Sequence, residues 1–210
     1  MAVHDLFVVL LAACGWFVVA RMLMGRNSAS GDVAVFGAAL ITLGGLCRVF
    51  WTLLGATIGW ELAWLGNILF PLLCAGFIFL AWALWRGLRG AKLNEGDSLL
   101  SWGVPIFLSV ALLGFAVFFE QRRPGRGWFM TMLVTATATN LLAITQLIRH
   151  AWKQRARLAA LFFVLHIIAL LSLAWLSSQT GTLQFLKQVI NTMSQGAFLA
   201  AALMLHKRNI

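Results

Sequence analysis

The sequence predicts an all-α integral membrane protein: one bundle of seven transmembrane helices, with the amino terminus outside and the carboxyl terminus in the cytoplasm. Three observations support this fold class: seven long apolar stretches, a composition of 61% hydrophobic and 10% charged residues, and positive charge that alternates between successive joints. A water-soluble domain of this composition would lack the polar side chains to cover its surface. Seven spans use most of the 210 residues, so we expect a single domain, 1–210.

The first three expected spans cover about residues 4–24, 33–55 and 60–85. Each is long enough to cross a bilayer as an α-helix, which satisfies its own backbone hydrogen bonds in lipid. The first ends at the turn-forming joint GRNSASGD, the second at GATIG, and the third at the charged joint RGLRGAKLNEGDS. Pro71 lies inside the third span, one turn after Asn67, and there we expect a kink.

The last four expected spans cover about residues 99–119, 127–149, 158–177 and 183–205. The joints EQRRPGRG, HAWKQRAR and SSQTGT separate them. A shift of 120 residues aligns small and polar positions of the third span with those of the seventh. This alignment suggests a pseudo-repeat of three spans, a linker span and three more spans, an arrangement that small carriers use.

The distribution of Lys and Arg predicts the orientation. One side of the predicted bundle holds five of the sixteen basic residues: Arg48, Arg122, Arg123, Arg126 and Lys187. The other side holds the remaining eleven: Arg21, Arg26, Arg86, Arg89, Lys92, Arg149, Lys153, Arg155, Arg157, Lys207 and Arg208. Since positive charge marks cytoplasmic loops, the second side should face the cytoplasm. We expect a bacterial cytoplasmic (inner) membrane.

Several classes of function lack their residues in this sequence. The net charge of +10 is dispersed over many joints, which indicates membrane lipids as partners and no nucleic acid. Cys14, Cys47 and Cys74 form no metal-binding spacing. His166 is the one histidine expected at membrane depth, so a haem held by two histidines has no second ligand. We therefore expect no metal and no cofactor, and the sequence shows no HExxH, GxSxG or phosphate-binding glycine loop.

Polar residues at membrane depth are the candidate site, because burying them in lipid is costly. Arg48 either extends to the outer interface beside Trp51, where it could pair with Glu61, or faces a cavity. Lys187, Asn191 and Gln195 share a helical face that either fastens helices together or lines a pocket. The ligand-binding candidates are Arg48, Asn67, Asn140, His166, Lys187, Asn191 and Gln195.

These residues support three functional hypotheses. The first is a protein without enzymatic activity that binds or transports a small neutral or anionic molecule through a polar cavity in the outer half of the bundle. The second is an accessory or structural subunit of a membrane complex, whose polar residues only fasten helices. The third is a lipid-modifying enzyme that uses His166 as a base beside a Ser or Thr nucleophile. The short joints are also compatible with a homo-oligomer.

Overall fold

The computed structural model describes residues 2–60, 62–89, 98–122, 125, 127–177 and 183–208. All regular structure in this part of the chain is helical, as the sequence predicts. The elements are α1 (Ala2–Met24), α2 (Ser28–Ile58), α3 (Ala63–Asn67), α4 (Leu69–Leu88), α5 (Ser98–Arg122), α6 (Gly127–Lys153), α7 (Arg157–Ser177) and α8 (Gln184–Lys207).

Six helical segments in the described ranges are long and apolar enough to cross a membrane. They are α1, α2, the α3–α4 segment Trp64–Leu88, α5, α6 and α8. The chain is therefore an integral membrane protein with a bundle of transmembrane helices. Helix α7 contributes a shorter apolar stretch, Arg157–Leu173, so the seventh crossing stays a prediction.

Helix α2 extends beyond the expected span 33–55 at both ends. At its start, the side chain of Asn27 accepts a hydrogen bond of 2.8 Å from the Ser30 backbone nitrogen. This contact satisfies one of the amide groups that a helix leaves without a partner in its first turn. At its end, Gly59 has a φ of 68°, the left-handed conformation that glycine adopts without strain. The side-chain cap at Asn27 and the left-handed Gly59, which hydropathy does not register, thus set the length of α2.

The third expected span, 60–85, is interrupted between Asn67 and Leu69, where α3 ends and α4 begins. Pro71 has no backbone N–H, so the carbonyl of Asn67 lacks the donor that would continue the helix. The sequence predicts a kink at Pro71, and the structure has a break between two helices at Ile68, three residues earlier.

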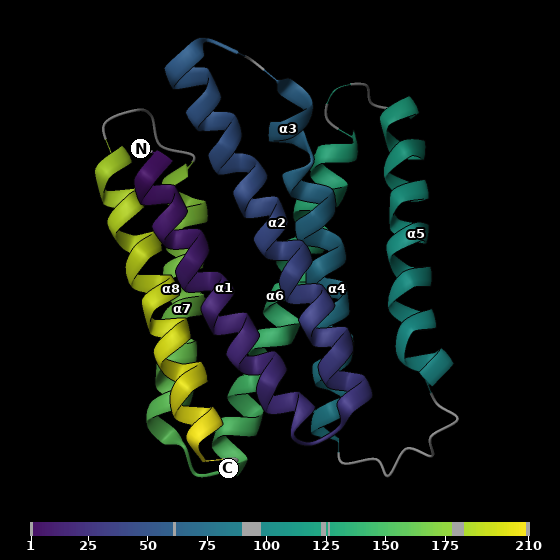
Figure 1. Ribbon diagram of the computed structural model, residues 1–210, viewed down its shortest axis with the longest axis vertical. Coiled ribbons are helices and arrows are strands. Elements are labelled where there is room, and N and C mark those ends of the chain that lie inside the picture. The colour runs from purple at the N-terminus through teal and green to yellow at the C-terminus, as the bar shows by residue number, and fades with distance from the viewer. Residues whose placement is uncertain are drawn as a thin grey trace.

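Six helices form a closed ring. Neighbours around the ring are α1 and α2, α2 and α4, α4 and α6, α6 and α7, α7 and α8, and α8 and α1. Figure 1 shows α5 at the edge of the bundle, and it packs against α6 and α4 from outside the ring. Helix α5 is also the least buried of the six candidate spans, so most of its surface is available to lipid.

The ring is held closed by a tight crossing of α2 and α4. A Cβ atom added to Gly37 would lie 2.7 Å from the carbonyl oxygen of Gly76, and one added to Gly76 would lie 2.8 Å from that of Gly37. Two glycines therefore let the helix backbones touch, as small residues commonly do between membrane helices. Below this crossing, the half of the ring that holds the carboxyl terminus is filled by large buried side chains, including Leu23, Leu84 and Leu205.

The two chain ends lie at opposite ends of the bundle (Figure 1). The carboxyl-terminal end carries the joint between α1 and α2 and the joint between α6 and α7. There Arg26 Nη1 lies 2.8 Å from His150 Nε2, and Arg208 Nη1 donates to the carbonyls of Gln154 and Arg155 at 3.3 and 3.2 Å. Basic residues thus connect neighbouring interhelical loops at this end of the bundle. Lys92, Arg123 and Arg126, which contribute to the charge on the two sides, and Glu61, the expected partner of Arg48 at the outer interface, lie outside the described residues.

Candidate functional site

A cavity of about 530 Å³ lies inside the half of the ring that holds the amino terminus. All six ring helices contribute to its wall, and α5 does not. Its volume falls within the range of about 300–1,000 Å³ that is usual for small-molecule sites. The polar side chains that line it are Asp5, Thr42, Arg48, Asn140, His166, Gln184, Asn191 and Gln195.

Five of the seven candidate residues lie in the cavity wall: Arg48, Asn140, His166, Asn191 and Gln195. The other two are not part of this wall. Asn67 is exposed at the end of α3, where the break before Pro71 begins. Lys187 is half-buried in the first turn of α8, and Gln184, one turn earlier, lines the cavity instead.

His166 is held in one orientation by Ser194 of the neighbouring helix α8. Its Nδ1 atom lies 3.0 Å from the carbonyl oxygen of Ser194 and 2.8 Å from the Oγ atom. A carbonyl oxygen only accepts hydrogen bonds, so Nδ1 carries the proton and donates. The Ser194 hydroxyl is then left to donate to the carbonyl of His166, at 3.4 Å. The second ring nitrogen, Nε2, is consequently an acceptor available to a molecule in the cavity.

The same contacts bear on catalysis by His166. A serine nucleophile would need Nδ1 as an unprotonated base, and it would need an exposed hydroxyl. Here Nδ1 also faces a carbonyl oxygen, and Ser194 is only 1% exposed. The geometry therefore favours a role in which Ser194 positions the imidazole, and it offers little support for the enzyme hypothesis.

Asn140 presents a buried acceptor in the wall of the cavity. Its Oδ1 atom has no hydrogen-bond partner among the described residues. Leaving such an acceptor unpaired costs about 1–3 kcal/mol. Gln146, two turns further along α6, differs in this respect because its Nε2 donates to the carbonyl of Ala81 on α4 at 3.2 Å. Gln146 thus fastens two helices, whereas Asn140 lines the cavity and its Oδ1 atom makes no such bond.

Among the described residues, two charged side chains line the cavity, Asp5 and Arg48. The guanidinium carbon of Arg48 lies 4.2 Å from the ring centre of Trp51, so a cation–π contact orients this exposed side chain. Asp5 was not among the candidates from the sequence. The loop between α1 and α2 is short, so α2 must run back alongside α1. This antiparallel pairing places Asp5, near the start of α1, opposite the region of Arg48 on α2. That register was the signal that could have identified Asp5.

Aromatic side chains close the inner end of the cavity. Trp16 and Phe77 both line it, with ring centres 5.8 Å apart. Phe198 lies behind them, fully buried, 4.5 Å from Trp16 and 5.9 Å from Phe163 between ring centres. The cavity therefore ends at a packed aromatic layer in this conformation. A continuous path through the bundle would require Trp16 or Phe198 to move.

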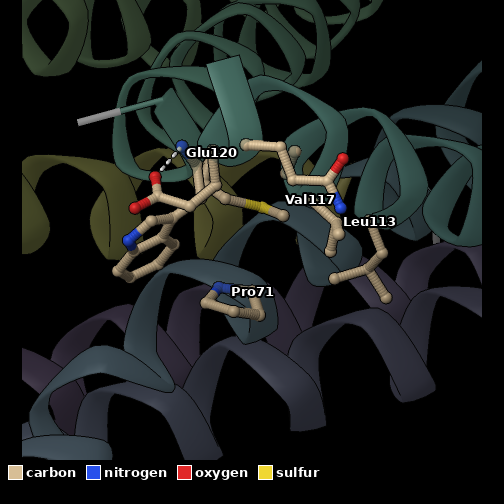
Figure 2. A pocket seen from close by; sticks show the side chains of 8 residues that line it. Pro71, Leu113, Val117 and Glu120 are labelled. Carbon is tan, nitrogen blue, oxygen red and sulfur yellow. Dashed lines mark hydrogen bonds between the residues drawn. The ribbon is translucent and has the colours of Figure 1, made fainter. Parts of the chain in front are cut away.

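A second cavity, of about 420 Å³, lies between α4, α5 and α6 (Figure 2). Pro71, Leu113 and Val117 line it together with Glu120. The Glu120 carboxylate accepts hydrogen bonds from the backbone nitrogens of Gly125 and Trp128, the latter at 3.1 Å. Glu120 thus caps the start of α6, and this cavity offers a ligand few polar contacts.

Fold and site together define a polytopic helical membrane protein with a polar cavity inside a six-helix ring. The chain matches no protein-family model, no curated protein and no solved structure at a significant level. Interpretation of the cavity consequently depends on its own residues.

Proposed function

We propose that this membrane protein binds a small polar molecule, neutral or anionic, in the cavity inside the helix ring, as the first step of its transport or sensing. The observation that carries this proposal is the presence of acceptors on His166 and Asn140 beside one shared cavity. A buried acceptor without a partner is costly, and a bound donor would remove that cost. Polar residues that served only as fasteners would bond to neighbouring helices, as Gln146 does.

We further propose that the cavity opens toward the outside of the cell. Many basic residues lie at the other end of the bundle, where Arg26, Arg155 and Arg208 link the joints. Positive charge at that end would place it in the cytoplasm. The aromatic layer around Trp16 and Phe198 would then separate the cavity from the cytoplasmic half. This arrangement corresponds to an outward-open state of a carrier, or to an extracellular binding site.

A binding screen with two matched variants tests the proposal. Wild-type protein in phosphatidylcholine nanodiscs is unfolded by heat in the presence of a panel of amino acids, organic acids, sugars and amides. We expect at least one compound to raise the midpoint temperature of unfolding, because at 100 times its Kd a ligand adds about 3 kcal/mol to the free energy of unfolding. Asn140→Leu should abolish this effect, because the substitution removes the buried acceptor. Gln146→Leu should lower the stability of the free protein and leave the ligand effect in place.

The proposal is contradicted if no compound stabilises the wild type, or if Asn140→Leu responds to ligand as the wild type does.

The accessory-subunit hypothesis has one supporting observation, the exposed apolar face of α5, which includes Phe107, Val110 and Phe115. Lipid alone could cover that face. A stoichiometric partner that co-purifies in mild detergent, and is lost when Phe107 and Val110 are replaced by Ala, would favour the subunit.

A further inference from the structure

The charged groups of the cavity indicate which charges the ligand itself carries. One wall residue, Asp5, is acidic and another, Arg48, is basic, so their formal charges cancel. Lys187, which would have made the cavity positive, is not in its wall. Neither Asp5 nor Arg48 has an ion-pair partner among the described residues. The cavity therefore presents two opposite charges that a ligand could neutralise.

Contacts between helices place these two charges at one level of the bundle. A Cβ atom on Gly45 of α2 would lie 2.8 Å from a side-chain methyl carbon of Val9 on α1, so these residues mark the same level. Asp5 lies four residues from Val9, and Arg48 lies three residues from Gly45, both toward the open end. At 1.5 Å per residue, these separations are about 6 and about 4.5 Å along the helix axes.

The acceptor of His166 lies within about two helical turns of this level. His4, next to Asp5, has its Nε2 atom 2.9 Å from the Oγ1 atom of Thr192 on α8. His166 contacts Ser194, two residues further along α8. Deeper in the bundle, a Cβ atom on Gly15 of α1 would lie 3.6 Å from the Cα atom of Leu199 on α8. Counted from these two contacts, Asp5 and His166 are separated by less than about 8 Å along the bundle axis. One small molecule could contact Asp5, Arg48 and His166 together.

We propose that the ligand is a zwitterion that combines a primary ammonium group with a carboxylate or phosphate, an inference that rests on the proposed function. The ammonium group has three N–H donors, and the cavity supplies acceptors on Asp5, His166 and Asn140. The anionic group binds the guanidinium of Arg48, whose geometry suits carboxylate and phosphate oxygens. A ligand with only one of these charges would pair with only one of the two side chains, so it would gain fewer charge-assisted contacts than a zwitterion.

Two sources could provide this chemistry: a free amino acid and the headgroup of phosphatidylethanolamine. Apolar side chains in the same wall, including Val9, Leu69 and Leu73, could receive an aliphatic side chain or the start of an acyl chain. Phosphatidylcholine is a matched negative control for the lipid, because its quaternary ammonium has no N–H donor.

The experiment measures binding by calorimetry in phosphatidylcholine nanodiscs. The soluble probes are the proteinogenic amino acids and phosphoethanolamine, with L-leucine, N-acetyl-L-leucine and L-leucinamide as a matched set. The lipid probe is phosphatidylethanolamine in the nanodisc, detected by native mass spectrometry. We expect one zwitterion to bind, and removal of its ammonium or its anionic group to weaken binding roughly tenfold or more. A soluble amino acid that binds identifies the first source, and retained phosphatidylethanolamine identifies the second.

Variants connect binding to the two charges. Asp5→Asn and Arg48→Gln should each weaken binding of the zwitterion roughly tenfold or more. Asp32→Asn and Arg89→Gln are the controls. Asp32 is exposed near the start of α2, and Arg89 stacks on Trp85 at 4.2 Å as Arg48 does on Trp51, but neither lines the cavity. Both controls should bind as the wild type does.

The outcomes separate the two proposals. If N-acetyl-L-leucine or another compound without an ammonium group binds as tightly as the zwitterion, and Asn140→Leu abolishes that binding, the zwitterion proposal is wrong and the proposed function stands. If no zwitterion of the panel binds, or if Asp5→Asn has no effect, the zwitterion proposal is also wrong. If no polar compound binds in a manner that depends on Asn140, both proposals fail.

Discussion

The imidazole of His166 and the serine at position 194 form a double contact between α7 and α8, with Nδ1 at 3.0 Å from the carbonyl oxygen and 2.8 Å from Oγ. This contact engages Nδ1 and leaves Nε2 as the ring nitrogen that can accept a hydrogen bond. A ligand must offer a donor to Nε2, because Nδ1 already donates to α8.

Replacement of Ser194 by Ala distinguishes a positioning role from a catalytic one. The Ser194→Ala protein keeps the carbonyl contact with His166 and loses only the hydroxyl. We expect the free energy of unfolding to fall by about 1 kcal/mol and ligand binding to change by no more than a few-fold. His166→Leu removes the acceptor itself and should abolish binding. Retained folding with complete loss of an acyl-transfer activity in Ser194→Ala would instead support the enzyme hypothesis.

The crossing of α2 and α4 predicts a position-specific effect of adding one methyl group. Gly37→Ala would place Cβ 2.7 Å from the Gly76 carbonyl oxygen and should cost about 1–3 kcal/mol of stability, because the helices must separate. Gly114→Ala on α5 is the matched control, since a Cβ atom there meets nothing within 4 Å. Alanine is the better helix former, so this control should be neutral or stabilising. Thermal unfolding in detergent measures both, and equal midpoints for the two variants would contradict the close crossing.

The charge distribution predicts the orientation in the membrane. Green fluorescent protein fused after Arg208 should fluoresce, because that end would lie in the cytoplasm. Alkaline phosphatase at the same position should be inactive, and alkaline phosphatase inserted after Gly59, at the other end of the bundle, should be active. The opposite pattern would show that the cavity opens to the cytoplasm.

Hydropathy and polar spacing were sufficient to predict the helical membrane fold and to select five residues that line one cavity. On α8, the four-residue spacing of Asn191 and Gln195 selected a face that lines the cavity. The spacing did not separate Lys187 from that face. At 100° per residue, Gln184, Asn191 and Gln195 lie within about 20° of one direction, whereas Lys187 is rotated by about 60°.

The remaining differences have physical causes that a hydropathy profile does not contain. Asn67 precedes the break at Ile68, so its position depends on how α3 is turned relative to α4. Asp5 lies near a chain end, and only its pairing with α2 brings it to the cavity. The contact between Ser194 and His166 joins separate helices and could not be derived from either sequence segment alone. The internal repeat and the homo-oligomer stay predictions.

The central claim is that the buried polar residues surround one water-accessible cavity, and cysteine accessibility tests it most directly. In a background without Cys14, Cys47 and Cys74, Gln195→Cys places a thiol in the cavity wall, and Gln146→Cys places one at the contact between α6 and α4. We expect a water-soluble thiol reagent added to open membrane fragments, where it reaches both faces of the membrane, to modify position 195 and to leave position 146 unmodified. Equally slow modification at both positions would contradict the claim.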